Sequence, residues 1–260
     1  MNGNRDRRTD CRAKSFILSL ILMILVAVSL CLSGCGSTGG SSGGSGDNSS
    51  GSASSGGKAE DSKEEAEEIK LIESGQNAYR SDSDVYMNCG FIIENPNEET
   101  AFEYPTVTVT AYDKKGEVLT TQEQTMMTIQ PGERQAFCIT SIDCSGEKPD
   151  SVEYEVDSGE AIPPSDEAVK STDYEISGTN ERIDKEYDEC KVTGKIKNTS
   201  PIDTNDVAVT VLFRKNGKIV YAGLTFVENL KAGKEKAFEI AEWKVPKHDA
   251  YEVSAVNWSY

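Results

Sequence analysis

The feature that most constrains the fold of this chain is an internal repeat with an offset close to 101 residues. Four pairs of segments match in the same order: 89–95 with 192–198, 106–119 with 207–220, 129–139 with 230–240 and, more loosely, 152–156 with 251–255. The first pair has an offset of 103, so the loop after Asn95 is two residues longer than its counterpart. Ordered matches with glycine and phenylalanine in register indicate a duplicated domain.

Each half of the repeat has the pattern of β-strands. Val192, Gly194 and Ile196 alternate with polar neighbours, a period of two that is typical of a half-buried strand. Asn216-Gly217 lies between two β-rich runs and predicts a hairpin, because both turn positions need a positive φ. Lys115-Gly116 is its weaker counterpart. About six or seven short strands in each half, with no helical period after residue 80, predict an all-β chain of two tandem immunoglobulin-like β-sandwiches.

The same pattern predicts the domain boundaries and the core. For the folded part we expect sandwiches at 69–158 and 172–260 and a short linker at 159–171. The predicted core residues are Phe91, Ile93, Tyr112, Phe137, Ile139, Ile196, Phe213, Phe238 and Ile240.

The strand that ends in Val-Thr-Ala-Tyr112-Asp113, followed by Pro-Gly-Glu and a phenylalanine strand, resembles the FxLYD-type domain. Alanine stands in the leucine place of that motif, and the second half has Thr-Val-Leu-Phe213-Arg214, without the tyrosine and the aspartate. The resemblance covers about residues 85–140 and 188–241. It implies a β-sandwich of the kind found in extracytoplasmic bacterial lipoproteins, and it carries no catalytic residues with it.

The N-terminal region is patterned for export and anchoring. Five basic and two acidic residues occupy the first 14 positions, and an almost wholly apolar run, 16–32, follows. This is the pattern of a secretory signal, and an uncleaved membrane anchor is the alternative. Leu32-Ser33-Gly34-Cys35 resembles the lipobox of bacterial lipoproteins. The resemblance implies a signal peptide at 1–34, cleavage between Gly34 and Cys35, and a diacylglycerol on the Cys35 sulfur. A lipidated cysteine and a disordered linker would then occupy 35–68.

The segment after the lipobox is expected to be a tether. Nearly every residue of 36–57 is glycine or serine, a composition that forms a flexible coil with a reach of about 25 Å. The charged stretch 58–68 has no apolar stripe and is expected to be disordered too. The chain would then work outside the cytoplasm, held on the extracytoplasmic face of the cell membrane by its lipid.

Charge excludes one class of partner. The whole chain has a net charge of −17, and the first 14 residues contribute +3, so the part after Gly34 carries −20. Such a surface repels nucleic acid and anionic lipid headgroups. We therefore expect no nucleic-acid partner. The expected partners are the membrane, through Cys35, and an unidentified envelope protein or wall component.

No catalytic constellation is evident in the sequence. His248, the only histidine, follows a proline turn signal and is expected to be an exposed loop residue. The acidic clusters lack the spacing of a calcium loop, and no phosphate-binding glycine loop lies between a strand and a helix. We therefore predict no catalytic residue, no metal site and no cofactor.

The disulfide state stays open at this point, because four cysteines (Cys89, Cys138, Cys144 and Cys190) allow three pairings. Alignment with the second half places Cys89 on the apolar face. The same alignment matches Cys138 with Glu239, a charged residue, so Cys138 is expected to face solvent. This argues against a bridge between Cys89 and Cys138. A bridge between Cys138 and Cys144 is locally plausible.

A group of aromatic residues lies near the C-terminus: Trp243, Tyr251, Trp258 and Tyr260. They are interpreted as core residues of the last domain, with a binding face as the alternative. The chain as a whole is predicted to be a non-enzymatic binding or interaction module. The alternative is a solute- or metal-binding lipoprotein that delivers cargo to a transporter, which would need a groove between the domains.

Overall fold

The computed structural model describes residues 66–258, which belong to one compact unit, Asp61–Tyr260. This part of the chain contains fifteen β-strands, one 3-10 turn and no α-helix, so the all-β prediction is confirmed. The predicted signal peptide, the Gly34–Cys35 lipidation site, the linker up to residue 65, and Tyr260 lie outside the described residues.

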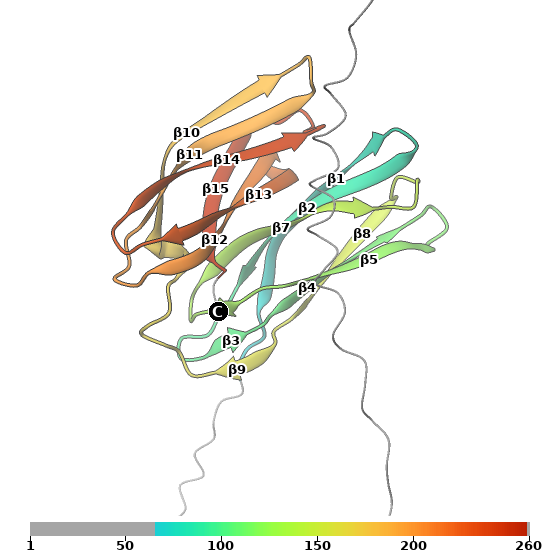
Figure 1. Cartoon of the computed structure of the whole chain (residues 1–260). Coiled ribbons are helices and arrows are strands. Elements are labelled where there is room, and N and C mark those ends of the chain that lie inside the picture. Colours follow the sequence, from blue (N-terminus) through green and yellow to red (C-terminus); the bar gives the residue numbers. More distant parts are fainter. Residues whose placement is uncertain (1–65, 259–260) are drawn as a thin grey trace, which may run out of the picture. The chain divides into compact units, whose positions relative to one another are not determined.

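The first half, residues 66–162, forms three antiparallel sheets (Figure 1). Its strands are β1 (Lys70–Ser81), β2 (Asp84–Glu94), β3 (Ala101–Glu103), β4 (Thr106–Tyr112), β5 (Val118–Thr125), β6 (Thr128–Ile129), β7 (Arg134–Asp143), β8 (Ser151–Asp157) and β9 (Glu160–Ile162). The sheets have the orders β1-β2-β7, β5-β4-β8 and β6-β3-β9. Strand β9 falls in the segment predicted as a linker and pairs with β3.

The second half, residues 171–258, repeats the two main sheets of the first. It contains η1 (Ser171–Asp173), β10 (Tyr174–Asp184), β11 (Glu189–Asn198), β12 (Thr204–Lys215), β13 (Lys218–Leu230), β14 (Glu235–Trp243) and β15 (Ala250–Asn257). The sheet β10-β11-β14 is equivalent to β1-β2-β7, and β13-β12-β15 is equivalent to β5-β4-β8. The predicted hairpin turn is present, because Asn216 and Gly217 both have positive φ.

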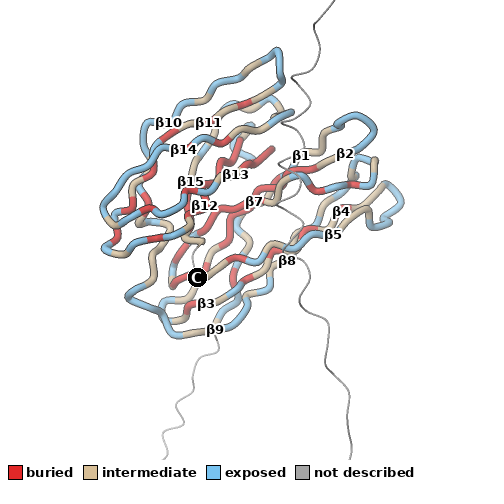
Figure 2. The backbone as a smooth tube through the Cα atoms, viewed as in Figure 1, coloured by how far each residue is buried: buried red, intermediate tan, exposed pale blue. Residues whose placement is uncertain are grey.

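The two halves share a core of their own, which we call the seam. It consists of Ile92, Ala136 and Cys138 from the first half and Leu212, Ile219 and Ala222 from the second. Side chains alternate across a strand, so β2 and β12 each turn one face to their own half and the other to the seam. The four main sheets therefore stack as β5-β4-β8, β1-β2-β7, β13-β12-β15 and β10-β11-β14 (Figure 1). Each of the two middle sheets has a core on both faces, and buried residues follow their strands (Figure 2).

One predicted core residue is wrong. Seven of the nine are buried in the cores of their halves and Ile139 is partly buried, but Tyr112 is only half-buried, and its hydroxyl donates to Glu153. The β-bulge of the hairpin lies between Ala111 and Tyr112 in the first half and between Phe213 and Arg214 in the second. Ala111, not Tyr112, is therefore the structural equivalent of Phe213. The turn after Tyr112 is one residue longer, and a shift of one residue moves a side chain to the other face.

The cysteine prediction is correct in one part and wrong in another. Cys89 faces the core of the first half, and Cys138 is on the opposite face of the sheet, as expected. However, Cys138 is fully buried in the seam and does not face solvent. All four described cysteines are free and buried, and burial raises the pKa of Cys89 to about 12. A neutral thiol is the favoured state at such positions.

Candidate binding groove beside the linker

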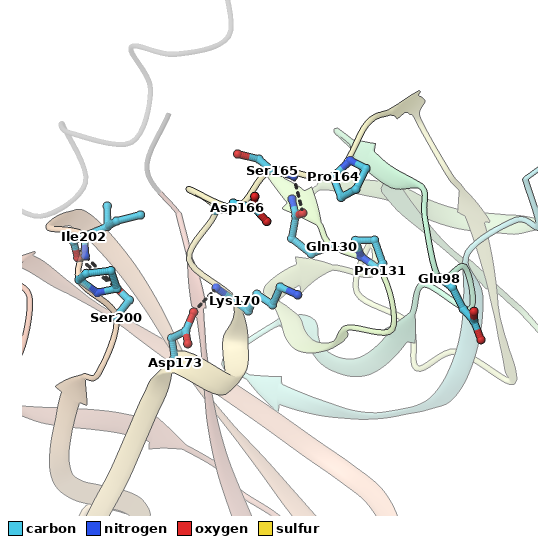
Figure 3. A pocket seen from close by; sticks show the side chains of 12 residues that line it. Glu98, Gln130, Pro131, Pro164, Ser165, Asp166, Lys170, Asp173, Ser200 and Ile202 are labelled. Carbon is cyan, nitrogen blue, oxygen red and sulfur yellow. Dashed lines mark hydrogen bonds between the residues drawn. The ribbon is translucent and has the colours of Figure 1, made fainter.

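A groove of about 590 Å³ lies where loops of both halves meet the segment that joins them. The first half contributes the turn at Gln130 and Pro131, and the second contributes the Ser200–Ile202 loop. The joining segment, from Pro164 to Lys170, lies between them (Figure 3). A groove at this place is what the solute-binding alternative requires.

The groove keeps its form because the joining segment is bonded to the first half. Glu133, which is 5 % exposed, accepts hydrogen bonds from the backbone N–H of Gln130 at 2.8 Å and of Ser171 at 2.6 Å. The Ser171 hydroxyl donates to the carbonyl of Arg134 at 2.9 Å, and Ser165 N–H donates to the side chain of Gln130. A single buried carboxylate thus connects the β6–β7 turn of the first half to the start of the second.

The lining is polar and has an excess of negative charge, because it contains one lysine and three acidic residues. Lys170 extends toward the Pro131 turn, and the carboxylates of Asp166 and Asp173 lie on either side of its backbone (Figure 3). Asp173 also accepts from the Lys170 N–H at 2.8 Å, which fixes the η1 turn. The groove can offer one ammonium group, carboxylates and amides to a small polar ligand.

His248 is not an exposed loop residue, contrary to the prediction. Its side chain is 7 % exposed, its Nε2 pairs with Glu181 at 2.5 Å, and its ring packs against Phe213. The thiol of Cys190 donates to the same carboxylate oxygen at 3.2 Å. Burial, and then the Glu181 carboxylate, raise the pKa of Cys190 to about 12, so the thiol stays protonated. A protonated, buried thiol is a poor nucleophile, and we assign this cluster to structure.

The terminal aromatic residues do not form one face. Trp258 stacks on Phe137 of the first half with 4.6 Å between ring centroids, and it packs against the core of that half. Trp243 is 53 % exposed at the other end of the second half, where it pairs with Glu189 beside the β10–β11 turn. Tyr187, in that turn, is 68 % exposed. We call Tyr187 and Trp243 the aromatic tip, and sequence reasoning missed Tyr187 because no pattern marks a turn residue as exposed.

Two kinds of feature are absent from residues 66–258, namely a cluster of potential metal ligands and a helix that could span a membrane. No group of three or more histidine, cysteine, aspartate or glutamate residues in this range could hold a metal ion. Within the same range, no helix has the length and apolar character needed to cross a bilayer.

Comparisons with known proteins assign no family to the chain. Neither the protein-family models nor the curated proteins include a match to the chain.

Proposed function

We propose that the chain is a non-enzymatic lipoprotein of the cell envelope, anchored by a lipid on Cys35 to the extracytoplasmic face of the cell membrane. The lipobox-like segment 32–35, the basic and apolar leader before it and the glycine-serine tether after it support this assignment. The resemblance to FxLYD-type domains supports the same class of protein. The folded unit would bind or position another envelope component, either a protein or a wall polymer.

The proposal that the chain binds a partner rests on one observation: an apolar seam and polar links hold the two halves together. The apolar seam is flanked by Arg214, which bonds Glu73 of the first half at 2.7 Å and Glu252 of the second at 2.9 Å. Glu133 adds a second link through Ser171. Receptors that close around a solute need a hinge between two lobes. A unit without a free hinge suits the docking of a partner on a preformed surface.

The anchor is tested by intact mass and membrane fractionation of the native protein beside the Cys35→Ala variant. A chain that begins at residue 35 with an added diacylglycerol mass, together with release of the variant from membranes, is expected. An unmodified chain that begins near residue 1 would support an uncleaved anchor instead.

The interaction role is tested by photo-cross-linking in whole cells. A photoreactive residue at Tyr187, in the aromatic tip, is compared with one at Val118, which is 58 % exposed on β5 of the first half. We expect a discrete adduct with one envelope component from position 187 and none from position 118. Identical adduct patterns from both positions would argue against a specific docking surface.

The groove supports a second candidate, a solute-binding lipoprotein. Its Lys170 and the neighbouring carboxylates could hold a small polar molecule or ion. Thermal unfolding in a panel of ions, amino acids and sugars tests this idea. A stabilising ligand whose effect disappears in Lys170→Ala, but persists in Lys148→Ala on the β7–β8 loop, would favour this second candidate over the first.

A further inference from the structure

Glu242 is a carboxylate in an unusual place. It lies on β14 and faces the same side as Phe238 and Ile240, which belong to the core of the second half. Its side chain passes the edge strand β13 at Gly223, where an added Cβ would lie 2.4 Å from its Cγ and Oε1. Beyond that glycine, Oε2 accepts a hydrogen bond from Nδ2 of Asn88 in the first half at 3.2 Å.

The contact ties both halves to one carboxyl group. Asn88 is 1 % exposed, and it also donates to the carbonyl of Ala222 at 3.2 Å and accepts from the Ser141 N–H at 2.9 Å. The hydroxyl of Tyr221 lies 3.4 Å from Glu242, and the backbone of Leu224 bonds to Glu242 as well. Glu242 thus lies where β2, β13 and β14 meet, at one edge of the seam.

Among the described residues, no cation contributes to the pKa of Glu242. The titratable groups on which its charge acts are Tyr79 on β1, Cys138 on β7, Cys190 on β11 and Tyr221 on β13, and the pKa of each is raised by it. Tyrosine and cysteine are neutral near pH 7 at their ordinary pKa values, and burial raises the pKa of each of these four further. On β10, Glu181 accepts from Cys190 and pairs with His248.

Burial raises the pKa of Glu242 from 4.5 to about 7, while the hydrogen bonds from Tyr221 and Asn88 act in the opposite direction. A folded-state pKa above the unfolded value favours folding when the group is protonated. The stabilising contribution is therefore complete below about pH 4.5 and is lost as the pH rises to about 7.

We propose that the protonation state of Glu242 sets how firmly the two halves hold together, and that the seam loosens when this carboxyl group becomes charged. A charged carboxylate needs more hydration than Asn88, Leu224 and Tyr221 supply, and the Tyr221 hydroxyl also donates to the Trp243 carbonyl at 2.9 Å. The stability of the folded unit would then depend on pH, whatever partner the unit binds.

Thermal unfolding of the full chain between about pH 4.5 and 8.5 tests the proposal with two variants. Glu242→Gln keeps the shape of the side chain and removes the titration. Glu239→Gln is the matched control, since Glu239 lies on the same strand, is exposed and faces away from the core. We expect the wild type and Glu239→Gln to lose stability relative to Glu242→Gln as the pH rises to about 7. The shift from 4.5 to about 7 allows the unfolding constant to change by at most about three-hundredfold.

Hydrogen exchange locates the effect. After correction for the intrinsic pH dependence of exchange, amides of β2 and β13 should lose protection between about pH 5 and 8 in the wild type but not in Glu242→Gln. Amides of β11, on the outer side of the second half, should not respond. Parallel stability curves for the wild type and Glu242→Gln, or an equal loss of protection in β2, β13 and β11, would overturn the proposal.

Discussion

The central strands β2 and β11 occupy equivalent places in the two halves, and their outer faces differ. On β11 that face carries Lys191, Thr193 and Lys195, and the strand alternates between buried and less buried residues. The matching positions of β2 are Asn88, Gly90 and Ile92, and the strand is buried on both faces from Met87 to Ile93. The difference shows that one sheet of each half has been adapted to contact the other half.

The second pair of equivalent sheets shows the same contrast in reverse. On β13 of the second half, the outer residues Ile219, Ala222 and Leu224 pack in or against the seam. Their counterparts on β5 of the first half are Val118, Thr121 and Glu123, and all three are exposed. Polar outer faces at both ends of a stack of repeats prevent further association. The outer faces of β11 and β5, which are polar apart from Val118, are consistent with a stack that ends after four sheets.

The largest effect is expected from a charge placed in the seam. Ile219→Lys would bury an ammonium group beside Gly75 and Gly90. An unpaired buried charge should lower the free energy of unfolding by about 3–5 kcal/mol. The equivalent Val118→Lys should change it by no more than about 0.5 kcal/mol, because Val118 is 58 % exposed. Urea unfolding measures both, and equal losses would contradict the difference between the two sheets.

Exchanging the residues at two equivalent positions, Gly90 of β2 and Thr193 of β11, tests how closely the two halves pack at the seam. A Cβ on Gly90 would lie 2.7 Å from Cδ2 of Leu212 and 2.8 Å from Cβ of Ala222. Gly90→Thr, which gives β2 the residue of β11, should therefore cost about 2–3 kcal/mol through overpacking. The reverse change, Thr193→Gly, should cost about 0.5–1 kcal/mol through chain entropy alone. A Gly90→Thr variant as stable as Thr193→Gly would show that the halves are not packed as described.

The buried asparagines sharpen the comparison, because here the halves should behave alike. Nδ2 of Asn95 donates to the carbonyls of Thr100 at 2.7 Å and Ile129 at 3.3 Å. Asn198 donates to Ile202 at 2.7 Å and Leu230 at 3.2 Å. Oδ1 of each asparagine also accepts from the backbone N–H two residues further on, that of Asn97 or Ser200, at 3.0 Å. Replacing either asparagine with alanine removes this whole set of hydrogen bonds, and each change should cost about 2 kcal/mol. Calorimetric unfolding of both variants checks the equality, and a cost confined to one half would contradict it.

The smallest expected difference concerns an equivalent pair near the hairpins. Tyr112 donates to Glu153 at 3.0 Å, and Arg214 bonds the equivalent Glu252 at 2.9 Å. Tyr112→Phe should change stability by no more than about 0.5 kcal/mol, because the contact is exposed. Arg214→Ala should cost about 1–2 kcal/mol, since Arg214 also bonds Glu73 across the seam. The double variant Arg214→Ala with Glu73→Ala measures the coupling, and additive losses would mean that this cross-seam pair contributes nothing.

The sequence by itself determined the class of the fold and the duplication. Strand periodicity and the Asn216-Gly217 turn depend on local rules, namely the alternation of side chains and the positive φ of the turn residues. The core residues Phe91, Phe137, Phe213 and Phe238 followed from the same alternation. The prediction for Tyr112 was wrong because one extra turn residue changes which face a side chain takes.

Only the tertiary structure decided how the two halves associate. A small or apolar residue on an outer face, such as Gly90 or Ile92, indicates that the face is covered but does not say what covers it. Contacts between residues more than a hundred positions apart, such as Asn88 with Glu242 and Arg214 with Glu73, depend on the stacking of whole sheets. The burial of Cys138 and His248, and the raised pKa of Glu242, follow from that stacking and loop packing, because desolvation depends on neighbours that no local pattern specifies.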